Sequence, residues 1–100
     1  MIGETRWQAE TVRLKGALMG RAGAAIGDIE ATYQRALEIA RAQEARLLEL
    51  RAATSLGQLW HGQGKANEAR ELLGPPYAWF TKGFDTPDLK DAKALLDELN

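Results

Sequence analysis

Apolar residues recur every three or four positions along most of the chain, with polar residues between them. This spacing places the apolar residues on one side of an α-helix. No convincing alternating pattern of strand length is present in the sequence, so we predict an all-α protein. Breaks in the pattern divide it into helices expected at about 4–19, 29–43, 44–61, 66–74 and 87–99.

The first predicted helix carries two neighbouring apolar stripes. One stripe consists of Trp7, Thr11, Leu14 and Leu18, and the other of Ala9, Val12, Gly16 and Met19. Three glycines within residues 20–28 then predict a turn, and Asp28 is the expected N-cap of the second helix.

Residues 74–100 are expected to close the helical array. The GPP sequence at 74–76 should end the fourth helix, because proline disrupts helix interiors. Pro75 or Pro76 can also begin a short helix that carries the aromatic residues, since proline is tolerated in the first turn. Thr86 stands before Pro87 and Asp88, an order typical of a helix N-terminus, so a final capping helix should begin there. The aromatic residues between these two points are expected to seal the end of the stack: Tyr77, Trp79, Phe80 and Phe84.

The chain also repeats itself. Gly16 aligns with Gly57 at an offset of 41 residues. At an offset of 40 residues, three further residues find counterparts: Ile29, Tyr33 and Ala36 align with Ala69, Leu73 and Pro76. We therefore expect one domain of two tandem antiparallel hairpins, at about 4–43 and 44–74, followed by the aromatic segment and capping helix at about 75–100.

The second hairpin resembles the tetratricopeptide repeat. Its residues fall on the W-x2-L-G-x2-Y and A-x3-F spacings of that family: Ala53, Leu56, Gly57, Trp60, Ala69 and Leu73. Small residues in such slots let two helices approach closely, and large residues fill the adjoining space. In the first hairpin Lys15 stands where the pattern has leucine, and the period near 40 is longer than the usual 34.

A wider resemblance covers nearly the whole chain. The segments YQRALEIARAQEARLLELRAATSLGQLW and WFTKGFDTPDLKDAKALLDEL look like the C-terminal end of certain proteobacterial regulators. Those regulators join an adenylate cyclase or transcriptional-regulator domain and a predicted signal-transducing ATPase domain to a tetratricopeptide-like array. The resemblance implies that this chain is the end of such an array, with a role in signal transduction. No cyclase aspartate pair or G-x4-GK[ST] loop is present, so neither catalytic activity is implied.

Charge and composition narrow the partners further. The chain has 13 basic and 14 acidic residues, which are interspersed, so we expect no nucleic-acid partner. Its apolar runs are short, so we expect no membrane span. The absence of cysteine fits a reducing compartment, and we expect a cytoplasmic protein.

No motif in the sequence predicts catalysis, a cofactor or a metal. The GQGK sequence at 62–65 follows a helix and lacks the Ser or Thr of a phosphate loop, so it should form the bend of a hairpin. His61 has no second histidine or cysteine with which to share a metal. The carboxylates near the C-terminus are expected to form a solvated helix face: Asp85, Asp88, Asp91, Asp97 and Glu98.

Helical-repeat proteins bind mainly through the first helix of each hairpin. The candidate groove residues on these helices are Arg13, Ala17, Arg51, Thr54, Gln58 and His61. We therefore predict a non-enzymatic scaffold that binds a protein or peptide partner, or packs against other domains of a larger regulator. Two alternatives stay open: self-association through exposed Trp7 or Leu14, and a nucleotide-binding or enzymatic domain that depends on Lys65 or His61.

Overall fold

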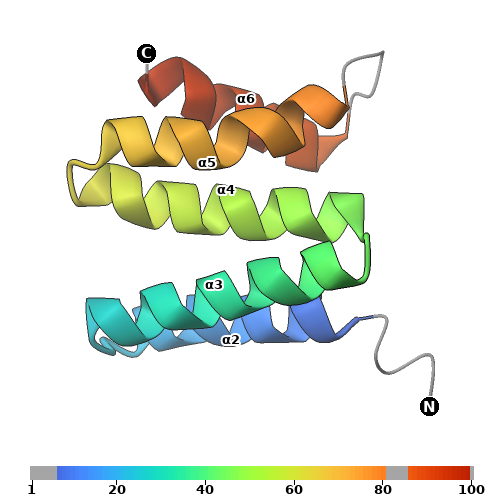
Figure 1. Ribbon diagram of the computed structural model, residues 1–100. Helices are drawn as coiled ribbons and strands as arrows, with labels where there is room; N and C mark the ends of the chain where they lie inside the picture. The colour runs from blue at the N-terminus through green and yellow to red at the C-terminus, as the bar shows by residue number, and fades with distance from the viewer. Residues whose placement is uncertain (1–6, 81–85, 100) are drawn as a thin grey trace.

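The computed structural model describes residues 7–80 and 86–99, and within these ranges the chain forms helices and no strand. The prediction of an all-α protein is therefore confirmed. The helices are α2 (Gln8–Arg21), α3 (Ile26–Ala42), α4 (Arg46–Gly62), α5 (Ala66–Trp79) and α6 (Pro87–Leu99) (Figure 1).

The helices form a stack with α4 at its centre. Consecutive helices run antiparallel, α2 lies behind α3, and α6 lies behind α5 (Figure 1). Only α4 contacts each of the other described helices. The molecule measures 41 × 35 × 20 Å, and its shortest dimension corresponds to about two helix diameters. The stack is therefore two layers deep.

The three turns that join α2 to α5 share one geometry. In each, a residue with positive φ ends the helix: Gly23 (81°), Glu44 (54°) and Gly64 (80°). The following amide donates a hydrogen bond to a carbonyl five residues earlier, as from Lys65 to Trp60 at 2.9 Å. This is the Schellman motif. The GQGK sequence therefore forms a hairpin bend, as predicted, whereas Glu44 ends α3 and does not begin α4.

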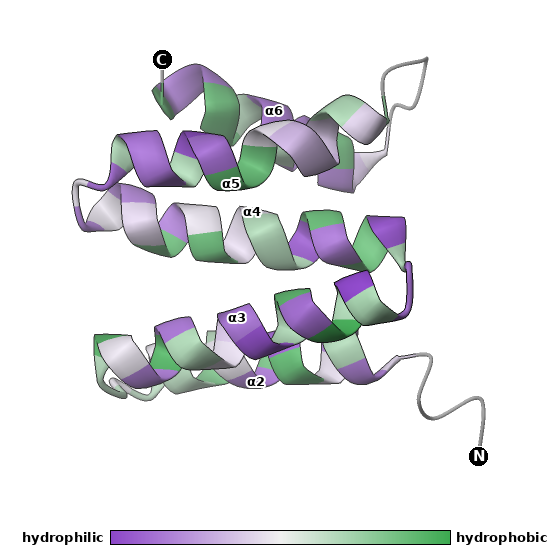
Figure 2. Ribbon diagram, viewed as in Figure 1, coloured by the Kyte–Doolittle hydropathy of each residue, from purple (hydrophilic) through white to green (hydrophobic). Residues whose placement is uncertain are grey.

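The core follows the amphipathic pattern of the chain, and Figure 2 shows that each helix carries both hydrophobic and hydrophilic residues. Its largest fully buried side chains are Leu50, Leu56 and Leu73. The positions aligned in the internal repeat are all buried: Gly16, Ile29, Tyr33, Ala36, Gly57, Ala69, Leu73 and Pro76. The repeat thus consists of packing residues.

Two further predicted helix boundaries are wrong. Helix α3 begins at Ile26 after an extended Ala25, so Asp28 lies in the first turn, where its charge complements the helix dipole. Helix α5 does not stop at the GPP sequence but continues through Pro75 and Pro76 to Trp79. Gly74 helps to explain this, because it has no Cβ to clash with the ring of the following proline.

The end of the stack is closed by α6 more than by the aromatic residues. Thr86 caps α6 as predicted: its side-chain oxygen accepts a hydrogen bond from the Leu89 amide at 3.3 Å. Tyr77 and Phe80 pack against the core. Trp79, however, is 56% exposed, so the prediction that it seals the stack is wrong. The Arg46 guanidinium lies over the Trp79 ring, with its central carbon 5.1 Å from the ring centroid. Phe84 lies outside the described residues.

Candidate functional site

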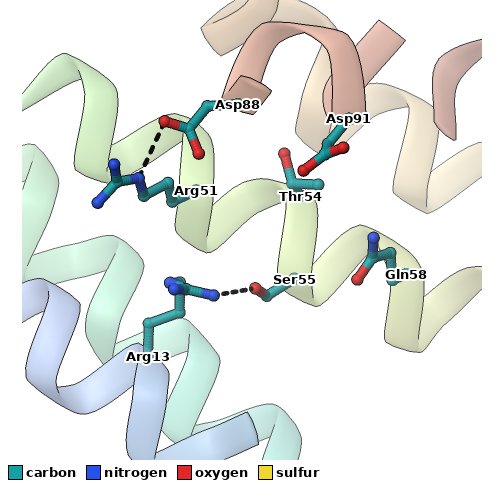
Figure 3. Close-up of a pocket in the computed structure, with 7 residues that line it drawn as sticks. All are labelled: Arg13, Arg51, Thr54, Ser55, Gln58, Asp88 and Asp91. Atoms are coloured by element: carbon teal, nitrogen blue, oxygen red, sulfur yellow. Dashed lines mark hydrogen bonds and ion pairs between the residues drawn. The ribbon is translucent and has the colours of Figure 1, made fainter. Parts of the chain in front are cut away.

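Three helices line a polar hollow of about 190 Å³ on one side of the stack. Figure 3 shows the side chains of α2, α4 and α6 converging on it. Its lining residues are Arg13, Arg51, Thr54, Ser55, Gln58, Asp88 and Asp91. A second hollow, of about 200 Å³, shares Gln58 and Asp91 with the first. Because they share these residues, we treat the two hollows as one groove, called the polar groove below.

Five of the six candidate residues chosen from the sequence lie in the polar groove. Arg13, Arg51, Thr54 and Gln58 line its first hollow, and His61 lines the second. The sixth candidate, Ala17, is half-buried on α2 and lines neither hollow. The five lie close together because α2 packs against α4. Equivalent positions of the two helices, such as Arg13 and Thr54, face the groove.

Glu10, which is not among these six residues, joins α2 to α4. Arg13 donates two hydrogen bonds to its carboxylate, both at 2.8 Å, and Arg51 donates a third at 3.4 Å. Arg13 also donates to the Ser55 hydroxyl at 3.2 Å. The spacing of Glu10 and Arg13, three residues apart on one helix, is a signal that could have predicted their pairing. No sequence pattern predicts that either residue contacts α4.

Arg51 links the same network to α6. Its Nε lies 3.1 Å from an Asp88 carboxylate oxygen, and the Asp88 side chain is 23% exposed (Figure 3). The prediction that Asp88 belongs to a solvated face is therefore wrong, because packing of α6 against α4 brings it to a guanidinium. Asp97, by contrast, is well exposed and pairs with Lys93 on its own helix. Asp85 lies outside the described residues.

The network changes the acidity of its members. The pKa of Glu10 is lowered, chiefly because Arg13 donates hydrogen bonds to the charged carboxylate; burial opposes this effect, and the positive charge of Arg51 adds to it. The pKa of Arg13 is raised, chiefly by its hydrogen bonds to Glu10. Both groups are therefore held in their charged forms.

The second hollow leaves negative charge uncompensated. It is lined by Gln58, His61, Asp91, Ala94, Leu95 and Glu98. His61 Nε2 lies 3.5 Å from a Glu98 oxygen, and Glu98 is 65% exposed. The carboxylate of Asp91 makes no hydrogen bond or ion pair with any other described residue. In the first hollow, each guanidinium already faces a carboxylate, so the charge left over in the polar groove is negative.

The hydroxyl groups that line the polar groove already take part in hydrogen bonds. The Ser55 oxygen accepts a hydrogen bond from Arg13, and a guanidinium stays protonated, so it cannot act as a base towards the hydroxyl. The Thr54 hydroxyl donates to the Leu50 carbonyl at 2.8 Å. Across residues 7–80 and 86–99, no three His, Cys, Asp or Glu side chains are grouped so that they could hold a metal ion.

Comparison with protein-family models, with curated proteins and with solved structures yields no match to this chain. None of the helices in the described part of the chain is long and apolar enough to cross a membrane. The polar groove itself is therefore the basis for assigning a function.

Proposed function

We propose that the protein is a non-catalytic scaffold of two tetratricopeptide-like hairpins, which binds a segment of a protein partner in the polar groove. The observation that carries this proposal is that α2, α4 and α6, which are every second helix of the stack, all contribute side chains to one groove. Such a surface is the usual binding face of helical-repeat proteins. The sequence resemblance suggests that this scaffold serves a larger bacterial regulator in the cytoplasm.

The charge distribution indicates the chemistry of the partner. The Glu10, Arg13, Arg51 and Asp88 side chains satisfy one another, so they form a fixed floor. Asp91 and Gln58 are exposed and have polar atoms available for a ligand. We therefore propose that the partner segment carries a basic side chain that lies near Asp91, with its backbone amide groups near Gln58.

A peptide-display selection against the wild-type protein would test this proposal. The selected peptides should be enriched in lysine or arginine, and Asp91→Lys should weaken their binding by about tenfold or more, equivalent to about 1.4 kcal/mol. Gln58→Ala should weaken it less. Both positions are exposed, so neither change should unfold the chain.

Glu71→Lys serves as the matched control, because Glu71 is an exposed carboxylate on α5 that lines neither hollow of the polar groove, and the variant makes the same change of charge as Asp91→Lys. It should leave binding unchanged. Arg51→Glu is a poorer test, since it would place a third carboxylate beside Glu10 and Asp88 and destabilise the fold. Binding that is insensitive to both Asp91→Lys and Gln58→Ala would reject the polar groove as the binding surface.

A further inference from the structure

Helix α2 and its N-cap residue, Trp7, expose a row of large apolar side chains to solvent. Trp7 is 55% exposed, Leu14 48% and Leu18 63%. With Thr11 they form one stripe along the helix, called the α2 stripe below. The opposite side of the helix packs into the hairpin: Ala9 is buried, and a Cβ added at Gly16 would lie 2.7 Å from the Tyr33 ring. The stripe is thus an apolar surface without a partner among the described residues.

The internal repeat allows the α2 stripe to be compared with the equivalent side of α4, which is covered. At the offset of 41 residues, the stripe corresponds to Leu48, Ala52, Ser55 and Leu59 of α4. This side of α4 faces the first hairpin: Leu48 packs with Ala9 and Ala40, and Ser55 receives the Arg13 hydrogen bond. On α4, the equivalent helix of the second hairpin, this side therefore lies in the contact between the two hairpins.

Lys15 argues against coverage of the α2 stripe by another hairpin of the same kind. Its counterpart in α4 is Leu56, which is 1% exposed and packs against Ile29 and Tyr33 of the preceding hairpin's second helix. A preceding hairpin on α2 would bury the Lys15 ammonium group in the same way, at a high cost in desolvation. In the structure Lys15 is exposed.

The spacing of the stripe suits an antiparallel pairing with itself. Its residues follow steps of four, three and four, the seam spacing of paired helices. In an antiparallel pair that places Trp7 opposite Leu18, Thr11 lies opposite Leu14, so that a small side chain meets a large one. Lys15 of one helix then faces the uncharged Gln8 of the other, and no like charges meet.

The other end of the stack does not offer a competing surface. The apolar side of α6 is buried in the core, through Leu89, Ala92, Leu95 and Leu99. Its exposed residues include Asp91, Lys93 and Asp97. A head-to-tail contact would therefore set an apolar stripe against a charged helix face, whereas a two-fold contact sets the stripe against itself and closes.

From these observations we propose that the α2 stripe pairs with the same stripe of a second copy of this chain, so that the protein forms a closed, antiparallel two-fold dimer. Arg13 points away from the stripe towards α4. Each copy therefore keeps its own polar groove, and the dimer presents two of them. This proposal does not depend on the function proposed for the groove.

Sedimentation equilibrium of the full chain tests the dimer. The wild-type protein should show a concentration-dependent monomer–dimer equilibrium, and Leu14→Glu should raise the dimer Kd by about tenfold or more, since it buries a charge in the seam. Trp7→Ala should weaken the dimer, whereas Trp79→Ala, at an equally exposed tryptophan on α5, should not. Circular dichroism should show that all variants keep their helices.

Cysteine cross-linking tests the orientation, because the native chain has no cysteine. Mixed Trp7→Cys and Leu18→Cys proteins should oxidise mainly to the heterodimer linked between positions 7 and 18. A protein that stays monomeric at every concentration, or a dimer unaffected by Leu14→Glu, would overturn the proposal. Preferential linkage of position 7 to position 7 would overturn the antiparallel arrangement.

Discussion

The two hairpins are built on the same pattern but meet different neighbours. In the first, Gly16 leaves room for the ring of Tyr33, which belongs to the second helix of the same hairpin. In the second, Gly57 leaves room for Leu95, which belongs to α6, the helix that follows the second hairpin. Equivalent glycines therefore serve a contact within one hairpin in the first case and a contact between units in the second.

This difference follows from position in the stack. Helix α4 is covered from both ends of the molecule, whereas α2 is covered from one. At the offset of 41 residues, the fully buried Leu50 corresponds to the small Ala9, and the buried Leu48 corresponds to the exposed Trp7. Similar helical patterns thus give a core helix at the centre and a half-covered helix at the edge, and four predictions test that contrast.

The largest effect is expected for Leu50→Ala. Leu50 has no solvent exposure, so its truncation should leave a cavity and reduce the free energy of unfolding by about 2–5 kcal/mol. Leu14→Ala, which removes the same atoms from the exposed face of α2, should cost less than about 0.5 kcal/mol in dilute monomeric protein. Urea denaturation of the two variants measures both. Equal losses would show that α2 is covered in the monomer.

A second contrast lies in the paired glycines. Gly16→Ala would place Cβ 2.7 Å from the Tyr33 ring, which is buried and rigid, so we expect a loss of about 1–3 kcal/mol. Gly57→Ala would place Cβ 3.1 Å from the terminal Cδ2 of Leu95, which can move. Because alanine favours helix over glycine by about 1 kcal/mol, this variant should stay within about 1 kcal/mol of the wild type.

Thermal denaturation of both glycine variants would provide the comparison. Gly20→Ala is the control on α2, since its Cβ would meet only ordinary contact with Ile29 at 3.9 Å. It should be neutral or slightly stabilising. If Gly57→Ala were as damaging as Gly16→Ala, α6 would be packed more rigidly against α4 than we infer.

The link between the hairpins should depend on pH through Glu10. Its pKa is lowered in the folded protein, so its contribution is complete above the ordinary value of 4.5 and is lost as the pH falls through the folded value. Glu10→Gln should therefore cost about 1–3 kcal/mol at pH 7. The gap from the wild type should narrow in acid, as followed by urea denaturation from pH 7 to pH 3. A gap independent of pH would contradict an ionic role for Glu10.

The smallest effect is expected at the cap of α6. Thr86 bonds to the Leu89 amide, whereas α2, α3, α4 and α5 have no side-chain cap of this kind. Thr86→Ala should lower stability by about 0.5–2 kcal/mol, and Thr86→Ser should restore most of the loss. Thermal melting of the pair measures this. No loss on Thr86→Ala would mean that packing against α4 and α5 alone fixes the start of α6.

Much of the fold could be predicted from the chain. The three-and-four spacing gave the helices, because a buried stripe requires that period whatever covers it. The Gly64 bend and the Thr86 cap were predictable because each depends on a few neighbouring residues. The end of α5 was not, since two prolines in a helix are tolerated only where the surrounding packing outweighs the hydrogen bonds they remove.

The candidate site divides in the same way. Arg13, Arg51 and Gln58 could be placed on one side of the stack because helical geometry fixes which residues share a face. The contacts of Arg51 with Glu10 and Asp88 join residues 41 and 37 positions apart, and no local pattern predicts which charges will meet over that distance. Asp88 and Asp97 look alike in the sequence, yet one is held by a guanidinium from α4 and the other is solvated.

By itself, the sequence determined the helices, their bends and the repeating set of packing residues, because these depend on interactions between residues a few positions apart. The tertiary structure alone decided which copy of the repeat is buried on both sides, which carboxylates pair with a guanidinium group and which apolar stripe stays exposed. Burial and ion pairing depend on which other part of the chain packs against a helix, so similar local patterns acquire different roles in α2 and α4.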